Sequence, residues 1–465
     1  MSKAYLVLAD GSIFEGKSIG AEGKTIGETV FTTGMTGYVE TLTDPSYYGQ
    51  IVTQTFPLIG NYGIENEDFE SKKSFVSGYI VRELCEGPSN FRCQGDLDSF
   101  LKAQGIIGIC GIDTRALTKK LRESGVMNGM ILSGEILKQV QDDRGSDVMP
   151  NLFRHLEEIK AYAIKDAVKS VQTKPVIPPL DGGICNGQSD TDCPVKPDND
   201  TEYNICLFDF GAKANIQREL EKRGCKVTVV PFDTSAEKVI SMRPDGIMLS
   251  NGPGDPAENV GVIEEIRKIC EWNKETLKQV QGDICVQDDI YGQDDIYGQG
   301  DICVQNDICV QNDICVQDDI YGQGDIYGQD DIYGQGDSHA ELVSASHAIP
   351  IFGICLGHQM LSLARGAKTC RLKYGHRGGN HPVKDVRTGR VYITSQNHGY
   401  AVEASTLPDF ARETFVNLND GTCEGVDYTD IPAFSVQFHP EACGGPHDTN
   451  FLFDRFLEML KNATK

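Results

Sequence analysis

The sequence predicts an α/β protein, with an N-terminal α+β domain followed by a doubly wound, mostly parallel domain that a low-complexity acidic insert interrupts. Three observations predict this arrangement. From Tyr203 onward, short apolar runs alternate with helical patterns, which is typical of a parallel sheet covered by helices on both faces. The first part of the chain instead has β-type runs broken by turns. Between residues 275 and 347 a short repeat replaces both patterns.

Length and composition restrict the classes of function. A chain of 465 residues has room for two or three domains. It contains no apolar run long enough to cross a membrane and no signal-peptide pattern, so a soluble, cytoplasmic protein is expected. The sixteen cysteines are irregularly spaced outside the repeat and form no CxxC pair, which indicates reduced thiols. The net charge of -25 argues against binding to nucleic acid or to membranes.

Residues 1–173 are expected to form the first domain. Tyr5–Phe14 reads as a β-hairpin around Asp10-Gly11. Gly11–Ser18 formally matches a phosphate-binding loop, but bulky residues lie inside it and no helix pattern follows, so we reject that interpretation. Gly108–Leu121 predicts a strand and then a helix that begins at the capping residues Asp113 and Thr114. Residues 174–202, rich in Pro, Gly, Asp and Asn, are expected to be a linker.

Residues 203–465 carry the alternating pattern of the second domain. Strands are predicted at Tyr203–Phe208, Lys226–Val230, Gly246–Ser250, Val391–Thr394 and Ala433–Phe438. Helices are predicted at Ala214–Arg223, Glu237–Met242 and Phe451–Leu460. The turn after Gly246–Ser250 contains two glycines, so its backbone N–H groups can face a ligand at the carboxyl edge of the sheet.

A sharp strand-to-helix turn stands out at Pro350–Gln359. Gly353 and Gly357 flank Cys355 in the pattern G-x-C-x-G, the thiol version of a nucleophile elbow. Such a turn leaves no room for a Cβ at its glycines. It also places the thiol at a helix N-terminus, which favours the thiolate, and the next N–H, that of Leu356, is positioned for an oxyanion. The competing interpretation is a buried structural cysteine.

The segment Gly282–Gln335 consists of nine hexapeptides with thirteen aspartates and no basic residue. A six-residue period is compatible with a β-helix, but each unit offers few apolar residues, so a disordered acidic loop is favoured. The insert, taken as about 275–347, enters between a helix and the strand that leads to Cys355. We expect it on the amino edge of that strand, away from the active site. Neither its cysteines nor Cys185 and Cys193 have the spacing of a metal site, and no metal is expected.

A cysteine nucleophile needs a base, and the base needs a residue that orients it. His439 follows a predicted strand and therefore belongs on the same edge as Cys355, and Glu441 is placed to hold its imidazole. His358, in the elbow helix, is the main rival base. His381 and His398 are expected in loops with structural roles.

These motifs carry a family resemblance. GICLGHQ around Cys355, SNGPGDP at Ser250–Pro256 and FHPE at Phe438–Glu441 resemble the class I, or triad, glutamine amidotransferases. In the first domain, GETVFTTGMTGYVETLTDPSYYGQIV and GIDTRALT, with FGAKANIQ in the second, are similar to the small, glutamine-hydrolysing chains of carbamoyl-phosphate synthases. The resemblance covers nearly everything except the linker and the insert.

The resemblance implies a function and a set of residues. It implies that Cys355, His439 and Glu441 hydrolyse glutamine, and that ammonia passes to a large chain, which makes carbamoyl phosphate from bicarbonate and ATP for arginine and pyrimidine biosynthesis. ATP and Mg are expected on that partner of a heterodimer, with no cofactor on this chain. The family's glutamine-binding positions match Ser46, Gly252, Gly254, Leu356, Gln359, Asn397, Gly399 and Tyr400.

Three departures from the family pattern stand out, and the last of them leaves an alternative open. Cys443-Gly444 replaces the usual Ser-Pro, and Ala214 replaces an often basic residue. The large insert is the more serious departure, and a catalytically dead docking subunit is the rival hypothesis. The intact Cys355, His439 and Glu441 favour the enzyme.

Overall fold

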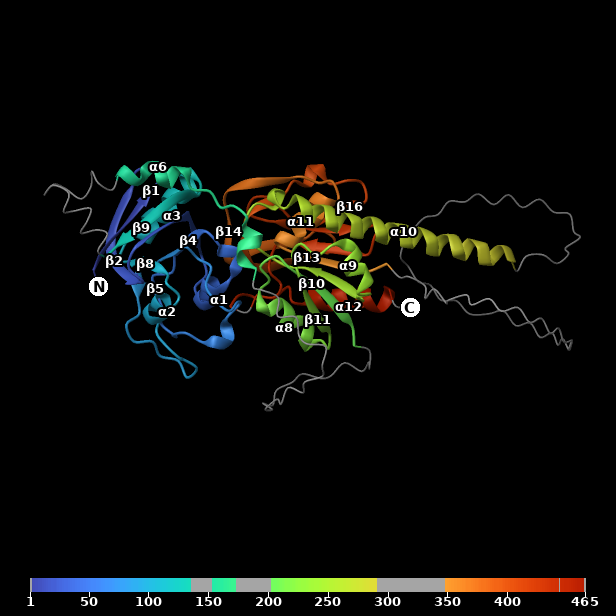
Figure 1. Cartoon of the computed structure of the whole chain (residues 1–465), viewed down its shortest axis with the longest axis horizontal. Coiled ribbons are helices and arrows are strands. Elements are labelled where there is room, and N and C mark those ends of the chain that lie inside the picture. Colours follow the sequence, from blue (N-terminus) through green and yellow to red (C-terminus); the bar gives the residue numbers. More distant parts are fainter. Residues whose placement is uncertain (1, 135–152, 173–201, 291–347, 443, 464–465) are drawn as a thin grey trace, which may run out of the picture. The chain divides into compact units, whose positions relative to one another are not determined.

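Figure 1 shows the computed structural model, which describes residues 2–134, 153–172, 202–290, 348–442 and 444–463. For residues 280–290 it describes the backbone only. The linker at 174–202 falls outside these ranges except for residue 202, and so does most of the predicted insert. Met1–Leu277 and His347–Lys465 form one compact unit, and Lys278–Ser346 form a second. The first unit carries every predicted site residue.

The N-terminal domain is a closed barrel with strand order β1-β2-β8-β6-β4-β3-β9. Its strands are β1 (Lys3–Leu8), β2 (Ile13–Gly20), β3 (Lys24–Thr32), β4 (Gln50–Gln54), β6 (Gly78–Ile80), β8 (Ile107–Cys110) and β9 (Met127–Ser133). A separate small sheet pairs β5 (Leu58–Ile59) with β7 (Glu83–Leu84). The helices described here are α1 (Tyr38–Thr43), α2 (Leu97–Ala103), α3 (Thr114–Ser124), α6 (Leu156–Ala161) and α7 (Ala167–Val171).

Local predictions for this domain are confirmed. Strands β1 and β2 form the expected antiparallel hairpin. The rejected phosphate-loop motif lies largely inside strand β2, so it has no strand-turn-helix geometry in which to hold a phosphate. Helix α3 begins after Asp113, whose carboxylate accepts a hydrogen bond from the N–H of Ala116 at 3.0 Å.

The C-terminal domain is built on a nine-stranded sheet with the order β11-β10-β12-β13-β18-β17-β15-β14-β16. The first five strands in this order are parallel to one another, and the remaining pairs are antiparallel. The strands are β10 (Asn204–Asp209), β11 (Lys226–Pro231), β12 (Gly246–Leu249), β13 (Ile351–Ile354), β14 (Thr369–Asp385), β15 (Val391–Val402), β16 (Ala411–Asn417), β17 (Cys423–Tyr428) and β18 (Ala433–Val436).

Helices cover both faces of the parallel strands, as a doubly wound fold requires (Figure 1). One core contains Ile205 and Leu207 of β10, together with residues of α8 (Ala214–Lys222) and α12 (Phe451–Ala463). The opposite core contains Cys206 and Phe208, packed with α9 (Ala236–Ser241), α10 (Val260–Ile290) and α11 (Leu356–Ala364). Because both faces of β10 are buried, its sequence reads as a continuous apolar run rather than an alternating one.

The register of two central strands sets the position of the site. Strands β13 and β18 are parallel neighbours, and Ile354 pairs with Val436. Cys355 follows the first of these residues directly, and His439 follows the second after two residues. The two side chains therefore leave the sheet at the same carboxyl edge.

Helix α10 differs from the sequence expectation at its C-terminal end. The repeat was expected to be a disordered loop, yet the backbone of α10 remains helical through Ile290, inside the first repeats. The costly step in helix formation is nucleation, and the packed first turns of α10 supply the nucleus, so a few more residues add to the helix at little cost.

Asn273 of α10 anchors the chain where it enters β13. Its side-chain amide donates to the carbonyl of Ile349 and accepts from the N–H of Ile349, both at 2.8 Å. Both residues are buried. This pair closes the base of the segment that carries the insert, at the amino end of the strand leading to Cys355 and opposite the predicted site. No helix among the described residues is long and apolar enough to span a membrane.

The amide pair gives a stability prediction. Asn273→Ala leaves a buried N–H and a buried C=O without partners, and should lower the free energy of unfolding of this domain by about 2–4 kcal/mol. Scanning calorimetry of the whole chain measures the effect. Asn419→Ala, at an exposed turn, is the matched control and should change stability by less than about 0.5 kcal/mol. Equal melting of the two variants would contradict the assigned role of Asn273.

Candidate active site

Cys355 adopts a strained backbone conformation. Its φ of 53° and ψ of -103° lie outside the regions that side-chain-bearing residues prefer. It directly follows β13, occupies the N-cap position of α11 and is buried, and its N–H donates to the carbonyl of Val436 at 2.9 Å. As the first residue of α11, Leu356 has an N–H without an acceptor inside the helix.

Close packing explains the two glycines of the elbow. A Cβ on Gly357 would lie 2.3 Å from the carbonyl oxygen of Leu249, and one on Gly353 would lie 3.0 Å from the backbone of Gly357. The predicted absence of room for a side chain is therefore confirmed. The turn can hold the strained Cys355 only because Gly353 and Gly357, two residues before and after it, lack a Cβ.

His439 and Glu441 form a fully buried pair beyond the end of β18. Nδ1 of His439 lies 2.7 Å from Oε1 of Glu441, and both side chains are inaccessible to solvent. The N–H of His439 donates to the carbonyl of Ser395 at 2.9 Å, which fixes the backbone. Nε2 of His439 is buried and has no hydrogen-bond partner of normal geometry among the described residues.

The charges around this pair keep the histidine protonated. Burial and the nearby Lys213 would lower the pKa of His439, but Glu441 and Cys355 outweigh them and raise it to about 10. Burial would raise the pKa of Glu441, but His439 and Lys213 lower it to about 2. The directions agree with an imidazolium–carboxylate ion pair. An imidazolium beside Cys355 can stabilise a thiolate and later donate a proton.

The sequence prediction missed Lys213, which lies between the two domains. Its Nζ lies 3.4 Å from Oε1 of Glu441 and 3.5 Å from Oδ2 of Asp44, a residue of the N-terminal domain. Burial lowers the pKa of Lys213, but the carboxylates of Asp44, Glu441 and Glu70 outweigh it and the pKa is raised. The Glu441 carboxylate is therefore linked by charge to the N-terminal domain. Lys213 lies within the segment FGAKANIQ, but nothing in this segment of the sequence indicates which carboxylates its side chain contacts.

Most of the predicted glutamine-binding residues line one cavity. It has a volume of about 280 Å³ and is lined by Cys355 and by residues of both domains. Seven of the eight predicted positions are among its lining residues: Ser46, Gly252, Gly254, Gln359, Asn397, Gly399 and Tyr400. Leu356 is not among them. Ser46 is fixed from the second domain, because its Oγ accepts from the amide of Asn251 at 2.9 Å.

Two glutamines bridge the elbow helix and the neighbouring strands. Gln359 donates to the carbonyl of Tyr400 at 2.7 Å and to the side chain of Gln437 at 2.9 Å. Gln437 in turn donates from Nε2 toward Sγ of Cys355 at 3.7 Å. The sequence analysis missed Gln437. It lies two residues before His439, at the end of the same predicted strand, and that position could have indicated a side chain near Cys355.

The other histidines are placed elsewhere. His358, the rival base, is fully buried and its Nδ1 lies 2.8 Å from Ser435 Oγ, while burial lowers its pKa to about 3. His381 and His398 were expected in loops, and this prediction is wrong. They lie in β14 and β15, two strands that pair with each other. The segments GHRGGNHP and SQNHGY are polar, so they lack the alternation of apolar residues from which a strand is predicted.

Comparisons with known proteins agree with this architecture. The family model described as carbamoyl-phosphate synthase small chain, CPSase domain, matches residues 6–131. The model described as glutamine amidotransferase class-I matches residues 206–277 and 334–459, which leaves out most of the repeat.

Similar full-length relatives come from several bacteria. The chain is 40% identical to the carbamoyl phosphate synthase small chain of Fusobacterium nucleatum over 100% of both chains. It is 41% identical to that of Listeria monocytogenes, over 99% of this chain and 97% of the relative. It is 42% identical to that of Vibrio cholerae, over 99% of each. The chain therefore belongs to the carbamoyl-phosphate synthase small chain family, and its C-terminal domain is a class I glutamine amidotransferase domain.

Proposed function

We propose that this chain hydrolyses L-glutamine at Cys355 and delivers the ammonia to a carbamoyl-phosphate synthase large chain. One observation carries the proposal. The strained Cys355 and the buried His439–Glu441 pair follow adjacent parallel strands, and Cys355 opens into a cavity lined by most of the positions that the family uses for glutamine.

The proposed reaction proceeds through a thioester. The Cys355 thiolate attacks the side-chain amide carbon of glutamine and forms a C–S bond, and the carbonyl oxygen becomes an oxyanion. His439 protonates the amide nitrogen, the C–N bond breaks, and ammonia leaves. His439, now neutral, takes a proton from water, whose hydroxide attacks the thioester and releases glutamate. Glu441 orients the imidazole through Nδ1 throughout.

We propose that the oxyanion is stabilised by backbone N–H groups. The N–H of Leu356 at the start of α11 has no acceptor in the helix, and the helix dipole adds partial positive charge there. A second donor would come from the Gly252–Gly254 turn, as the resemblance implies. Leu356 would then act through its backbone N–H and not through its side chain.

The cavity offers charges of both signs for a zwitterionic amino acid. Arg371 and Arg377 line it beside Glu28 and Asp255. We propose that these groups, with the eight positions named above, hold the ends of glutamine. Glu28 and Ser46 come from the N-terminal domain, which would therefore complete the substrate site.

The partner and the pathways follow from the family. We propose a heterodimer with a large chain that consumes bicarbonate and ATP with Mg, in arginine and pyrimidine biosynthesis. A second cavity of about 500 Å³ shares Asn397 with the first and is also lined by Asp44 and Lys213. It reaches Met35 and Pro446, and we propose it as the way out for ammonia.

The rival function is a dead docking subunit. Glutamate release, measured with and without the large chain, separates the two. The enzyme hypothesis predicts glutaminase activity that the large chain stimulates. Folded protein that releases no glutamate in either condition would favour the docking subunit.

Replacement of the nucleophile should separate the two half-reactions. In the complex, Cys355→Ser should abolish glutamine-dependent carbamoyl phosphate synthesis and leave synthesis from added ammonia intact, because the large chain performs that chemistry. Cys423→Ser, at another buried thiol of the same domain, is the matched control and should retain both activities. If Cys355→Ser loses both, Cys355 has a structural role instead.

Variants of the buried pair should differ in degree. His439→Asn removes the group that moves the proton, and should reduce turnover more than Glu441→Gln, which removes only the orienting carboxylate.

The Glu441→Gln variant should also change the pH dependence. Without the carboxylate, burial should lower the pKa of His439, so the imidazolium form is lost at a pH well below the pKa of about 10 in the parent. The pH dependence of Cys355 alkylation measures this: reactivity near neutral pH should fall more than tenfold. Identical profiles in parent and variant would remove Glu441 from the mechanism.

The insert should be dispensable. Asn273 and Ile349 already hold the ends of the segment together, opposite the active-site edge. A short Gly-Ser linker in place of residues 280–346 should therefore preserve glutaminase activity and change the melting temperature by only a few degrees, and mild protease should cut the parent first between residues 275 and 347. A deletion variant that is folded but inactive would show that the insert is a working part.

A further inference from the structure

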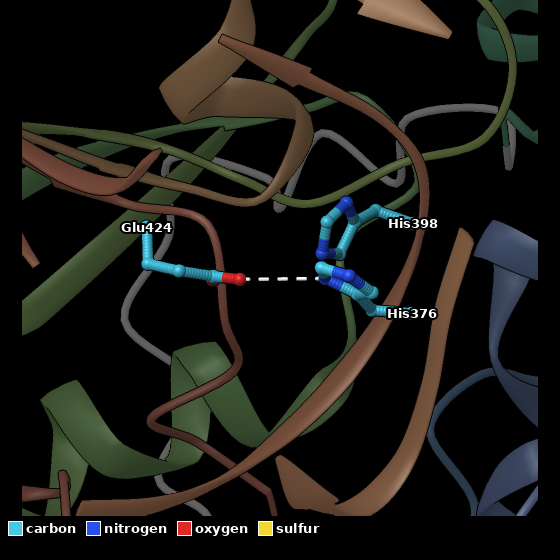
Figure 2. Close-up of side chains that lie close together, drawn as sticks. All are labelled: His376, His398 and Glu424. Atoms are coloured by element: carbon cyan, nitrogen blue, oxygen red, sulfur yellow. Dashed lines mark ion pairs between the residues drawn. The ribbon is translucent and has the colours of Figure 1, made fainter. Parts of the chain in front are cut away.

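Three side chains from the neighbouring strands β17, β15 and β14 meet in one buried cluster. Figure 2 shows His376 of β14, His398 of β15 and Glu424 of β17 turned toward one another. One potential ligand atom from each lies within 4.8 Å of the others, and all three side chains are buried. None of them is among the proposed catalytic or glutamine-binding residues, although His398 also lines the cavity that contains Cys355.

His376 is oriented by a second carboxylate. Its Nε2 lies 2.8 Å from Oδ2 of Asp420, and its Nδ1 lies 3.4 Å from Oε1 of Glu424. The side-chain nitrogen of Asn417 lies 3.4 Å from the same Nδ1 and donates to Oε1 of Glu424 at 2.9 Å, so an ion bound there would replace this donor. A metal-binding histidine usually holds the ion through one ring nitrogen and donates a hydrogen bond from the other ring nitrogen to a carboxylate. Asp420 lies on the exposed turn between β16 and β17, so it forms the outer side of the cluster.

His398 is oriented by a backbone carbonyl. Its Nδ1 lies 2.7 Å from the oxygen of Tyr400, and a carbonyl can only accept, so Nδ1 carries the proton. In the neutral ring Nε2 is then an acceptor.

Nε2 of His398 faces a second acceptor. It lies 2.9 Å from Oε1 of Gln396. The amide cannot be turned round without loss, because its nitrogen donates to Oγ1 of Thr394, and that hydroxyl donates to the carbonyl of His381. Two lone pairs at this distance repel each other unless a cation lies between them. The separation is close to the ~3 Å between two ligands of one metal ion.

Further acceptors around the cluster lack partners among the described residues. Oε2 of Glu424 and Nδ1 of His381 are buried and make no hydrogen bond. A buried carboxylate oxygen without a partner is costly, and a bound cation removes that cost.

We propose that His376 Nδ1, His398 Nε2 and the Glu424 carboxylate bind one Zn²⁺ ion, with Gln396 Oε1 or water in the fourth position. Two imidazoles and a carboxylate form a ligand set that suits zinc. This revises the expectation of no metal, which considered cysteine spacing alone. His398 stands between Asn397 and Gly399, so the ion would brace the strand that lines the glutamine cavity.

Zinc binding by the intact chain tests the proposal directly. The thiols are first alkylated, because cysteines would bind zinc independently, and the protein is freed of metal with a chelator. Zn²⁺ is then titrated against a chromophoric chelator, and Co²⁺ provides a visible spectrum of a site with nitrogen and oxygen ligands. One zinc ion per chain should remain bound after gel filtration.

Two variants keep the test independent of folding. Glu424→Gln removes a ligand charge and should weaken zinc binding by more than 100-fold, and Asp420→Asn, at the exposed turn, should weaken it by about 10- to 100-fold. His155→Gln, in the solvent-facing pair of His155 and Glu158, is the control and should bind zinc as the parent does. The proposal would be overturned if the folded, alkylated parent retained no zinc, or if the parent and the three variants bound zinc with equal affinity. The cluster would then hold only a proton.

Discussion

The backbone of Cys355 is the constraint on which the site depends. Its positive φ costs about 1–3 kcal/mol, which the surrounding fold has to supply. The close packing of α11 against β12 helps to hold this conformation. It requires a glycine at position 357, because a Cβ there would lie 2.3 Å from the carbonyl oxygen of Leu249. The parallel pairing of β13 with β18 then brings His439 to the same edge. A shift of one residue in that register would turn the side chains of β18 to the opposite face of the sheet.

A buried set of charges connects this edge to the N-terminal domain. Lys213 lies between Asp44 and Glu441, and Glu70 accepts hydrogen bonds from the backbone and side chain of Asn215 at the start of α8. Removing one partner of a buried ion pair leaves an uncompensated charge and commonly costs about 3–5 kcal/mol. The association of the two domains and the charge state of the Glu441 carboxylate are therefore coupled. This is a physical reason for the N-terminal domain to be more than a docking platform.

Sequence patterns predicted the parts that obey strong local rules. The elbow, the alternation of strands and helices, and the shared edge of Cys355 and His439 follow from glycine geometry and from the topology of parallel sheets. Lys213, Asp44 and Gln437 could not be found this way, because their roles depend on contacts between distant segments. Strand β14, and the part of β15 that follows the predicted strand Val391–Thr394, were missed for a different reason. Their side chains are polar where they line the cavity and the histidine cluster, so the apolar alternation that marks a strand is absent.

The central claim is that Cys355, rather than another of the buried thiols, is the residue that attacks glutamine. A glutamine analogue with a diazoketone in place of the amide alkylates an attacking thiolate and leaves a stable mark. Peptide mapping by mass spectrometry after incubation of the intact chain, with its large chain present, locates that mark. Modification is expected at Cys355 alone, and excess glutamine should slow it. Labelling of a different cysteine, or an unlabelled Cys355 in folded protein, would contradict it.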